Sequence, residues 1–271
     1  MLIIFWSPFE GQSRSTTNMA AVASTLALDY HMRILLTQSS EKNGDLERWL
    51  LKSDRAGEQR GLDAVHRLFS CGMFSSEGLR DHAEPILRER LDLLASRNLT
   101  EDQIQELMPH ILEGYRRFYD LLFVDLSACT GSELRSYLLD KADVIVTSVN
   151  QNRLLLDRYF NDIRRELPSG KSVLSCIGSY ERGSKLHKDR IMRQYGISKK
   201  EIGAVPRNVR LMDAQNEGQL MTYLMRAREA KGKFLEFSEE AEFTKSLRHL
   251  GGMLLQALEL YPASDLEAGD D

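Results

Sequence analysis

Cysteine is scarce in this chain of 271 residues, and the three that occur, Cys71, Cys129 and Cys176, lie far apart. Their spacing fits neither a metal-ligand pattern nor a disulfide framework, so we expect free, buried thiols in a reducing compartment. Long apolar runs are missing too, since no stretch approaches the roughly 18 uninterrupted apolar residues of a membrane span. No basic region precedes the short apolar run at the start, as it would in a signal peptide. These absences predict a cytoplasmic protein with no membrane span.

A surplus of positive charge is also lacking. The chain has 36 Lys and Arg residues against 40 Asp and Glu, a formal net charge of −4, so no overall basic field attracts nucleic acid. Hydrophobic residues make up 42% and charged residues 28% of the chain, which is ordinary for a soluble globular protein with a substantial core. The length fits one large α/β domain, or one domain with an insertion.

The most informative stretch is the first. The apolar run Leu2–Trp6 predicts a buried strand, a hydroxyl-rich loop follows, and apolar residues recur at helical spacing over 19–26. A strand, a tight polar loop and a helix start bring free backbone N–H groups and the positive end of the helix dipole together, which favours phosphate binding. The P-loop pattern is G-x-x-x-x-G-K-[ST]. Here Gly11, Gln12 and Ser13 occupy its last three positions, so the frame is present but the lysine is absent.

A second informative stretch lies in the middle of the chain. A predicted strand at Leu121–Val124 delivers Asp125 at its carboxyl end, the edge at which open α/β sheets bind ligands. The other interpretation of Asp125 is a cap for the helix that begins near Ser132. Further along, Pro206 ends a predicted strand because it fixes φ, and Asn208 offers amide donors and acceptors to a ligand. The sequence therefore predicts a ligand pocket at the carboxyl edge of one sheet.

The rest of the chain alternates between predicted strands and helices. Further strands are predicted at residues 33–36, 144–149, 172–178 and 202–206, and helices at 214–230 and 239–260. Residues 41–119 are predicted to be mostly helical, with helices at 86–94 and 104–118. We therefore expect an α/β fold, a doubly wound, mainly parallel sheet flanked by helices. It would form a single domain at 1–262 with a helical insertion at about 41–119.

Two charged segments stand apart from this pattern. Residues 181–200 are locally basic. They fit either the solvated face of an amphipathic helix, with Leu186, Ile191 and Met192 facing inward, or a surface that binds DNA phosphates. We favour the solvated face and keep nonspecific DNA binding as the alternative. Residues 263–271 form a short acidic tail that we expect to be disordered.

With these motifs in place, the chain resembles the ParA/MinD-like P-loop ATPases, the SIMIBI class, whose deviant Walker A loop reads K-G-G-x-G-K-T-T. Gly11 matches a loop glycine, and Ser13 supplies a hydroxyl where the family has threonine. The segment 18–21, Asn-Met-Ala-Ala, falls where the family has an Asn-Leu-Ala-like helix segment. Ser7 stands at the family's signature lysine and Gln12 at its phosphate-binding lysine. The resemblance thus implies a degenerate nucleotide site.

The resemblance continues at matching intervals over nearly the whole chain, most weakly over 41–119. Asp125 matches the family's aspartate that holds the magnesium water shell, so the resemblance implies a catalytic role for it. Magnesium would be held through Ser13 and Asp125. The residues that would bind ATP or ADP are Gly11, Gln12, Ser13, Arg14, Ser15, Pro206 and Asn208.

Family members place an acidic residue just past the second strand, whereas this chain has no carboxylate over 37–40. Relatives form homodimers and use ATP to position cargo such as pilus or secretion machinery, division regulators or DNA partition complexes. With two lysines and this carboxylate absent, we expect a positioning or assembly factor with a protein partner and weak or no ATP hydrolysis. The alternative is a functional Mg-ATPase in which Arg14 substitutes for the loop lysine.

Overall fold

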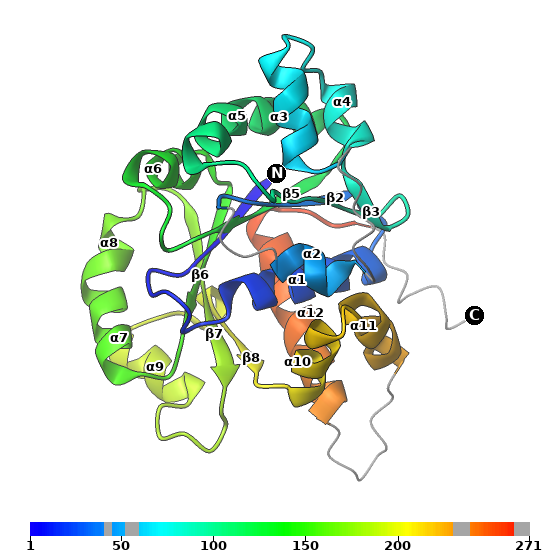
Figure 1. Ribbon diagram of the computed structural model, residues 1–271. Coiled ribbons are helices and arrows are strands. Elements are labelled where there is room, and N and C mark those ends of the chain that lie inside the picture. Colours follow the sequence, from blue (N-terminus) through cyan, green and yellow to red (C-terminus); the bar gives the residue numbers. More distant parts are fainter. Residues whose placement is uncertain (41–44, 52–59, 230–238, 263–271) are drawn as a thin grey trace.

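The computed structural model describes residues 1–40, 45–51, 60–229 and 239–262. Its centre is an eight-stranded sheet in the order β3-β4-β2-β5-β1-β6-β7-β8 (Figure 1). The strands are β1 (Leu2–Trp6), β2 (Ile34–Gln38), β3 (Glu84–Leu87), β4 (Leu91–Leu94), β5 (Leu121–Leu126), β6 (Val144–Val149), β7 (Ser172–Tyr180) and β8 (Ile202–Pro206). The β3–β4 pair is antiparallel and the other neighbouring pairs are parallel. The predicted doubly wound, mainly parallel sheet is therefore confirmed.

Helices cover both faces of the sheet (Figure 1). One face carries α1 (Ser15–Asp29), α2 (Asp45–Leu50), α10 (Val209–Asn216), α11 (Leu220–Glu229) and α12 (Glu239–Ala257). The other carries α3 (Leu62–Ser70), α4 (Ser76–Asp81), α5 (Glu101–Gly114) and α6 (Ser132–Lys141), followed by α7 (Arg153–Arg158) and α9 (Lys188–Tyr195). Short turns complete the list: η1 (Tyr115–Arg117), the π-helical η2 (Tyr159–Ile163), α8 (Arg164–Glu166) and η3 (Lys199–Glu201).

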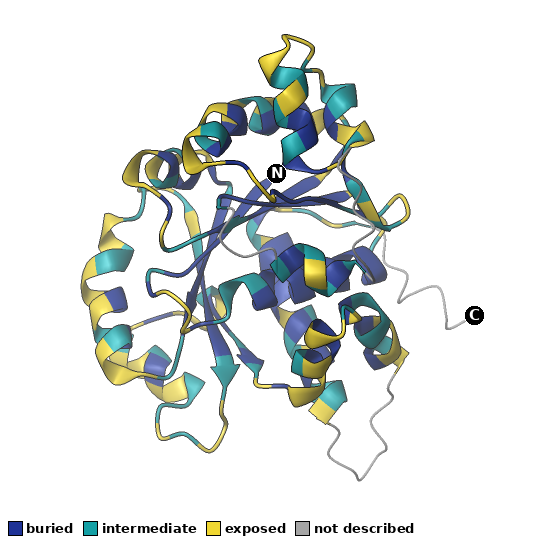
Figure 2. Cartoon of the chain, in the orientation of Figure 1, coloured by how far each residue is buried: buried dark blue, intermediate teal, exposed yellow. Residues whose placement is uncertain are grey.

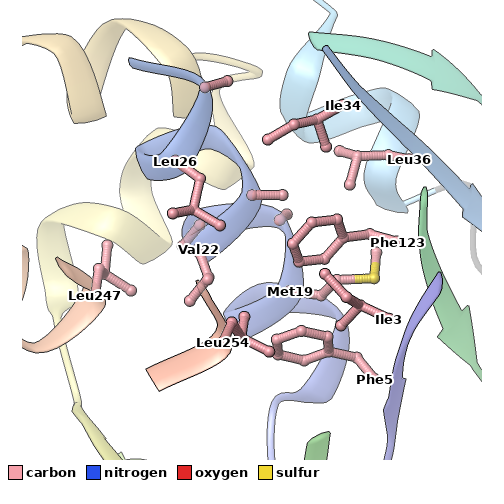
Figure 3. Close-up of a cluster of buried hydrophobic side chains, with 14 of the residues drawn as sticks. Ile3, Phe5, Met19, Val22, Leu26, Ile34, Leu36, Phe123, Leu247 and Leu254 are labelled. Atoms are coloured by element: carbon pink, nitrogen blue, oxygen red, sulfur yellow. The ribbon is translucent and has the colours of Figure 1, made fainter. Parts of the chain in front are cut away.

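Helix α1 is the centre of one core. Its residues are buried continuously from Thr17 to Asp29, because the helix lies between the sheet and α12 (Figures 2 and 3). Met19 lies toward the strand residues Phe5 and Phe123. On the α12 side, a Cβ added to Gly251 would come within 3.0 Å of the Leu26 side chain, so the two helices approach closely. Burial from both sides accounts for the small residues in this helix.

Two predicted helices have a different structure. Residues 86–94 were predicted to be helical, but they form most of the β3–β4 hairpin that extends the sheet. In β4, Asp92 is half-buried between fully buried leucines, the period of two that belongs to a strand. The predicted helix at 214–230 divides into α10 and α11 at Gly218, which has a φ of 64°. Because the β3–β4 hairpin lies within 41–119, that insertion is not purely helical.

The three cysteines form no disulfide among the described residues, as predicted, but two of the three are not buried. Cys71 and Cys129 are exposed, and Cys176 is buried. Burial raises the pKa of the Cys176 thiol to about 12. Among the described helices, none is long and apolar enough to cross a membrane. The predicted disordered tail, 263–271, lies outside the described residues.

Candidate functional site

A cavity of about 480 Å³ lies at the carboxyl ends of the central parallel strands. Its walls come from the loop after β1, the start of α1, the end of β2, the start of α2 and the loop after β5. The lining residues are Ser7, Phe9, Glu10, Gly11, Ser13, Arg14, Ser15, Thr16, Thr17, Gln38, Ser40, Asp45, Trp49, Asp125, Leu126, Ser127, Ala128 and Cys129. The first loop and Asp125 therefore face one cavity, although more than a hundred residues separate them in the chain.

A hydrogen bond joins the two sides of this cavity. The Thr16 hydroxyl, in the first turn of α1, donates to Asp125 Oδ2 over 2.6 Å. Asp125 sits next to Phe5 of β1 and Gln38 of β2 in the sheet register. Burial raises the pKa of Asp125 to about 6; the bond from Thr16 opposes this shift, and the nearby Asp45 carboxylate adds to it. Asp125 therefore does not cap α6, whose N-cap is Gly131.

The Thr16–Asp125 pair changes the frame of the loop. In a P-loop the hydroxyl that follows the lysine shares the magnesium ion with a strand-end aspartate. Thr16 is the hydroxyl that bonds Asp125, so the lysine position falls on Ser15, the first residue of α1. The preceding position, a glycine in the pattern, is Arg14, which adopts a left-handed conformation with φ 52°. This frame lies three residues later than the one read from the sequence.

The shifted frame changes which residues stand at the two lysines. In this frame K-G-G-x-G-K-T-T would align with Glu10 to Thr17, which would put Glu10 rather than Ser7 at the signature lysine. Ser15 rather than Gln12 stands at the phosphate-binding lysine. Gln12 does not line the cavity, and its carbonyl and side-chain oxygens lie 3.4 Å from Asn150 Nδ2. The Thr16-Thr17 pair, matching the T-T of the motif, is the signal in the sequence that would have identified this frame.

The loop retains features of an anion site. Gly11 has a φ of 69°, and Arg14 at the N-cap of α1 makes no side-chain capping bond. The first N–H groups of α1 thus have no cap from that residue. The hydroxyls of Ser13 and Ser15 are buried with no hydrogen-bond partner, although both residues line the cavity. Unpaired buried hydroxyls beside a helix N-terminus fit phosphate oxygens, and Thr16 with Asp125 fits a hydrated magnesium ion.

Strand β7 supports the loop from behind. Asn18 Nδ2 donates to the Ser13 carbonyl over 3.3 Å and lies 3.6 Å from Cys176 Sγ of β7. Two residues along β7, a Cβ added to Gly178 would overlap the Ser13 carbonyl oxygen and lie 2.8 Å from Asn18 Nδ2. Only glycine admits this approach of loop and strand.

The other predicted nucleotide-binding residues lie in different surroundings. Arg14 lines the cavity, but its Nη2 lies 3.4 Å from Met212 Sδ of α10. Pro206 and Asn208 do not line this cavity. Asn208 caps α10, and its Oδ1 accepts from the Leu211 N–H over 2.7 Å. The structure thus groups Gly11, Ser13, Arg14, Ser15 and Asp125, and it does not bring Gln12, Pro206 or Asn208 into their cavity.

Residues 37–40, at the end of β2 and just after it, contain no carboxylate, but an acidic residue that the sequence analysis overlooked lies nearby. Gln38, beside Asp125 in the sheet, donates to the Ser40 carbonyl over 2.8 Å. Asp45, at the start of α2, lines the cavity and is close enough to Asp125 to affect its pKa. It was missed because it lies beyond the window in which a carboxylate was sought. The described lining therefore carries three acids, Glu10, Asp45 and Asp125, and one cation, Arg14.

The basic segment 181–200 contains α9. Ile191 is buried, while Leu186 and Met192 are half-buried, the arrangement expected of an amphipathic helix lying on the surface. Arg182 forms an ion pair with Glu242 of α12.

Solved structures share this fold. A ParA family ATPase from Chlorobium tepidum matches 92% of this chain and 98% of its own, with a TM-score of 0.70 and 16% identity. The septum site-determining protein MinD from Pyrococcus horikoshii, complexed with Mg-ADP, matches 99% and 97%, with a TM-score of 0.66 and 14% identity. A putative plasmid partition protein from Borrelia burgdorferi, bound to AMPPNP, matches 94% and 98%, with a TM-score of 0.65 and 12% identity.

No family model and no curated protein sequence matches the chain. At these identities the structural matches establish the fold, that of the ParA and MinD P-loop ATPases, over essentially the full length of the chain.

Proposed function

We propose that this chain, which has the fold of the ParA and MinD ATPases, is a nucleotide-responsive positioning or assembly factor that hydrolyses ATP weakly or not at all. The observation that carries the proposal is the Thr16–Asp125 pair at the N-terminus of α1. The pair stands in a cavity whose two lysine positions hold Ser15 and Glu10. Groups suited to magnesium and phosphate are thus present, while the described lining holds no lysine to stabilise the transition state.

Magnesium would be held by the Thr16 hydroxyl and Asp125, since Mg²⁺ prefers oxygen ligands and keeps several waters. Bound there, the ion would offset negative charge on the phosphates. The backbone N–H groups of the loop and of the first turn of α1 would donate hydrogen bonds to phosphate oxygens, and so would the hydroxyls of Ser13 and Ser15. These contacts require no lysine, which supports binding of ATP or ADP.

Hydrolysis demands more than binding. The transferred phosphoryl group spreads negative charge over its oxygens, and fixed cations offset that charge in the transition state. Ser15 is neutral and short, and Glu10 has the opposite charge. Removing one such stabiliser typically costs on the order of 100-fold in rate. In addition, Gln38 and Ser40 provide no carboxylate to orient the attacking water.

The second candidate is a working Mg-ATPase with a rebuilt site. Arg14 would substitute for the lysine, and Asp45 would orient the water. Their place in the cavity lining favours this possibility. The contact of Arg14 with Met212 counts against it, because that contact holds the guanidinium toward α10.

Cargo and assembly follow from the fold by analogy alone. We propose a homodimer with a protein partner in a pilus or secretion machine. DNA partition through the basic segment 181–200 is the less favoured branch, since the chain as a whole is acidic.

Calorimetric titration of magnesium with ATP and with ADP tests binding, and steady-state phosphate release tests turnover. We expect binding without turnover, and loss of the magnesium dependence of binding in Asp125→Ala. Turnover that Asp125→Ala abolishes would instead establish the rebuilt ATPase. Absence of binding for both nucleotides would refute the proposal.

A further inference from the structure

The charges around the loop cavity point to a selection between nucleotides, an inference that rests on the proposed nucleotide binding. The described lining has three carboxylates and one guanidinium. Neither Glu10 nor Asp45 forms an ion pair within 4.0 Å among the described residues, and the Asp125 carboxylate accepts its side-chain hydrogen bond from the neutral Thr16 hydroxyl. The formal charge of the described lining is therefore net negative, with three carboxyl groups against one guanidinium.

The phosphate-binding features of this cavity are neutral groups. They are the N–H groups at the start of α1 and the unpaired hydroxyls of Ser13 and Ser15. The dipole at a helix N-terminus acts over the first turn only. It therefore stabilises the phosphate that is bound directly to the helix, and does little for the next phosphate of the nucleotide.

The described lining contains no lysine that could serve a more distant phosphate. A P-loop lysine reaches the β- and γ-phosphates, whereas the Ser15 side chain ends at its hydroxyl, which is buried at the helix start. Arg14 is the one cation in the described lining, and it lies against Met212. Within the described lining, an additional phosphate therefore adds negative charge to a cavity that already holds Glu10 and Asp45, without gaining a lysine.

We infer that the loop cavity selects nucleoside diphosphates over nucleoside triphosphates, with Glu10 and Ser15 as the residues that determine the preference. One bound magnesium ion neutralises the same charge on either nucleotide, so the excess charge of the triphosphate remains. The chain then occupies a diphosphate-bound state at equal concentrations of the two nucleotides, without first hydrolysing a triphosphate.

Calorimetric titration of ADP and of ATP, each with magnesium, into the full chain tests the inference. We expect ADP to bind at least tenfold more tightly than ATP. Glu10→Gln should narrow this ratio and Glu10→Lys should narrow it further, chiefly by tightening ATP. Glu89→Gln, an exposed glutamate on the β3–β4 hairpin, is the matched control and should leave the ratio unchanged.

Ionic strength provides a second measurement, because salt screens charge repulsion. The ratio should fall as salt is raised. Equal or tighter binding of ATP by the unmodified chain would overturn the inference while leaving the proposed function intact. A ratio unaffected by both Glu10→Lys and Ser15→Lys would also overturn it, since the preference would then have another origin. Failure of both nucleotides to bind would overturn the proposed function and this inference together.

Discussion

The two ends of α1 differ in how their polar groups are satisfied. At the carboxyl end, Arg90 donates to the Tyr30 carbonyl over 2.7 Å, and Asp29 accepts from Arg228 and Arg248 at 3.0 and 2.8 Å. At the amino end, the side chain of the N-cap residue Arg14 makes no capping bond to the helix, and the Ser15 hydroxyl has no partner. One helix thus has a saturated end that joins it to α11 and α12, and an unsaturated end that faces a cavity. Unsatisfied groups in an otherwise well-bonded element mark the place of a ligand.

The largest effect is expected at the saturated end. Asp29 is 1% exposed, and Asp29→Ala removes the buried carboxylate that balances the charges of Arg228 and Arg248. We expect a loss of about 3 kcal/mol in the free energy of unfolding, measured by urea denaturation. Asp140→Ala, at an exposed aspartate 3.9 Å from Lys141, should change it by less than about 0.5 kcal/mol. Equal effects of the two variants would remove the distinction between the ends of the helix.

At the unsaturated end, removing the charge of Asp125 is expected to increase the free energy of unfolding. The pKa of Asp125 is about 6 in the folded chain, above its unfolded value, so the folded state holds the proton more tightly. Ionised Asp125 therefore opposes folding above pH 6, and this cost disappears as the pH falls toward 4. Asp125→Asn should stabilise the chain by about 2 kcal/mol at pH 8 and by little at pH 4. Urea denaturation at the two pH values checks this, and a pH-independent difference would contradict it.

Restoring the lysine tests the frame of the loop. Ser15→Lys puts an ammonium at the first residue of α1, where we expect it to tighten ATP binding at least tenfold, or about 1.4 kcal/mol. Gln12→Lys, the position indicated by the sequence frame, should leave the affinity unchanged, because Gln12 does not line the cavity. Calorimetry on the two variants decides between the frames, and the reverse order of affinities would restore the earlier one.

A smaller loss of stability is expected when the donor to the helix carbonyls at the saturated end is removed. Arg90→Ala removes the donor to Tyr30 and the longer contact to Ala27, so we expect a loss of about 1 kcal/mol in stability. Arg88→Ala, two residues earlier on the same hairpin and exposed, is the comparison variant. If both variants matched the unmodified chain in urea, the carbonyl contacts would contribute nothing measurable.

Most of the parallel sheet could be predicted because its strands are short apolar runs buried on both faces. The β3–β4 hairpin was not, because the apolar residues over 86–94 fit a helical spacing as well as a strand's period of two. The approach of α12 to Leu26, made possible by Gly251, is a contact between distant segments that no local pattern contains.

The candidate site was predictable in part for the same reason. The position of Asp125 at a strand end and the polar loop before α1 follow from local pattern, and both line one cavity as expected. The Thr16–Asp125 bond favours a loop frame three residues later than the predicted one, which followed Gly11 rather than the Thr16-Thr17 pair. Asp45 was missed because it comes from a helix whose start could not be placed from the residues before it.

By itself, the sequence determined the class of the fold and the absence of lysine from the first loop, since apolar periodicity and residue identity are local properties. The tertiary structure alone decided that Thr16 meets Asp125, that Glu10 and Ser15 line the same cavity as this pair, and that the described lining carries more acids than cations. These depend on side chains brought together from separate strands and helices, and only the packed sheet fixes which of them meet.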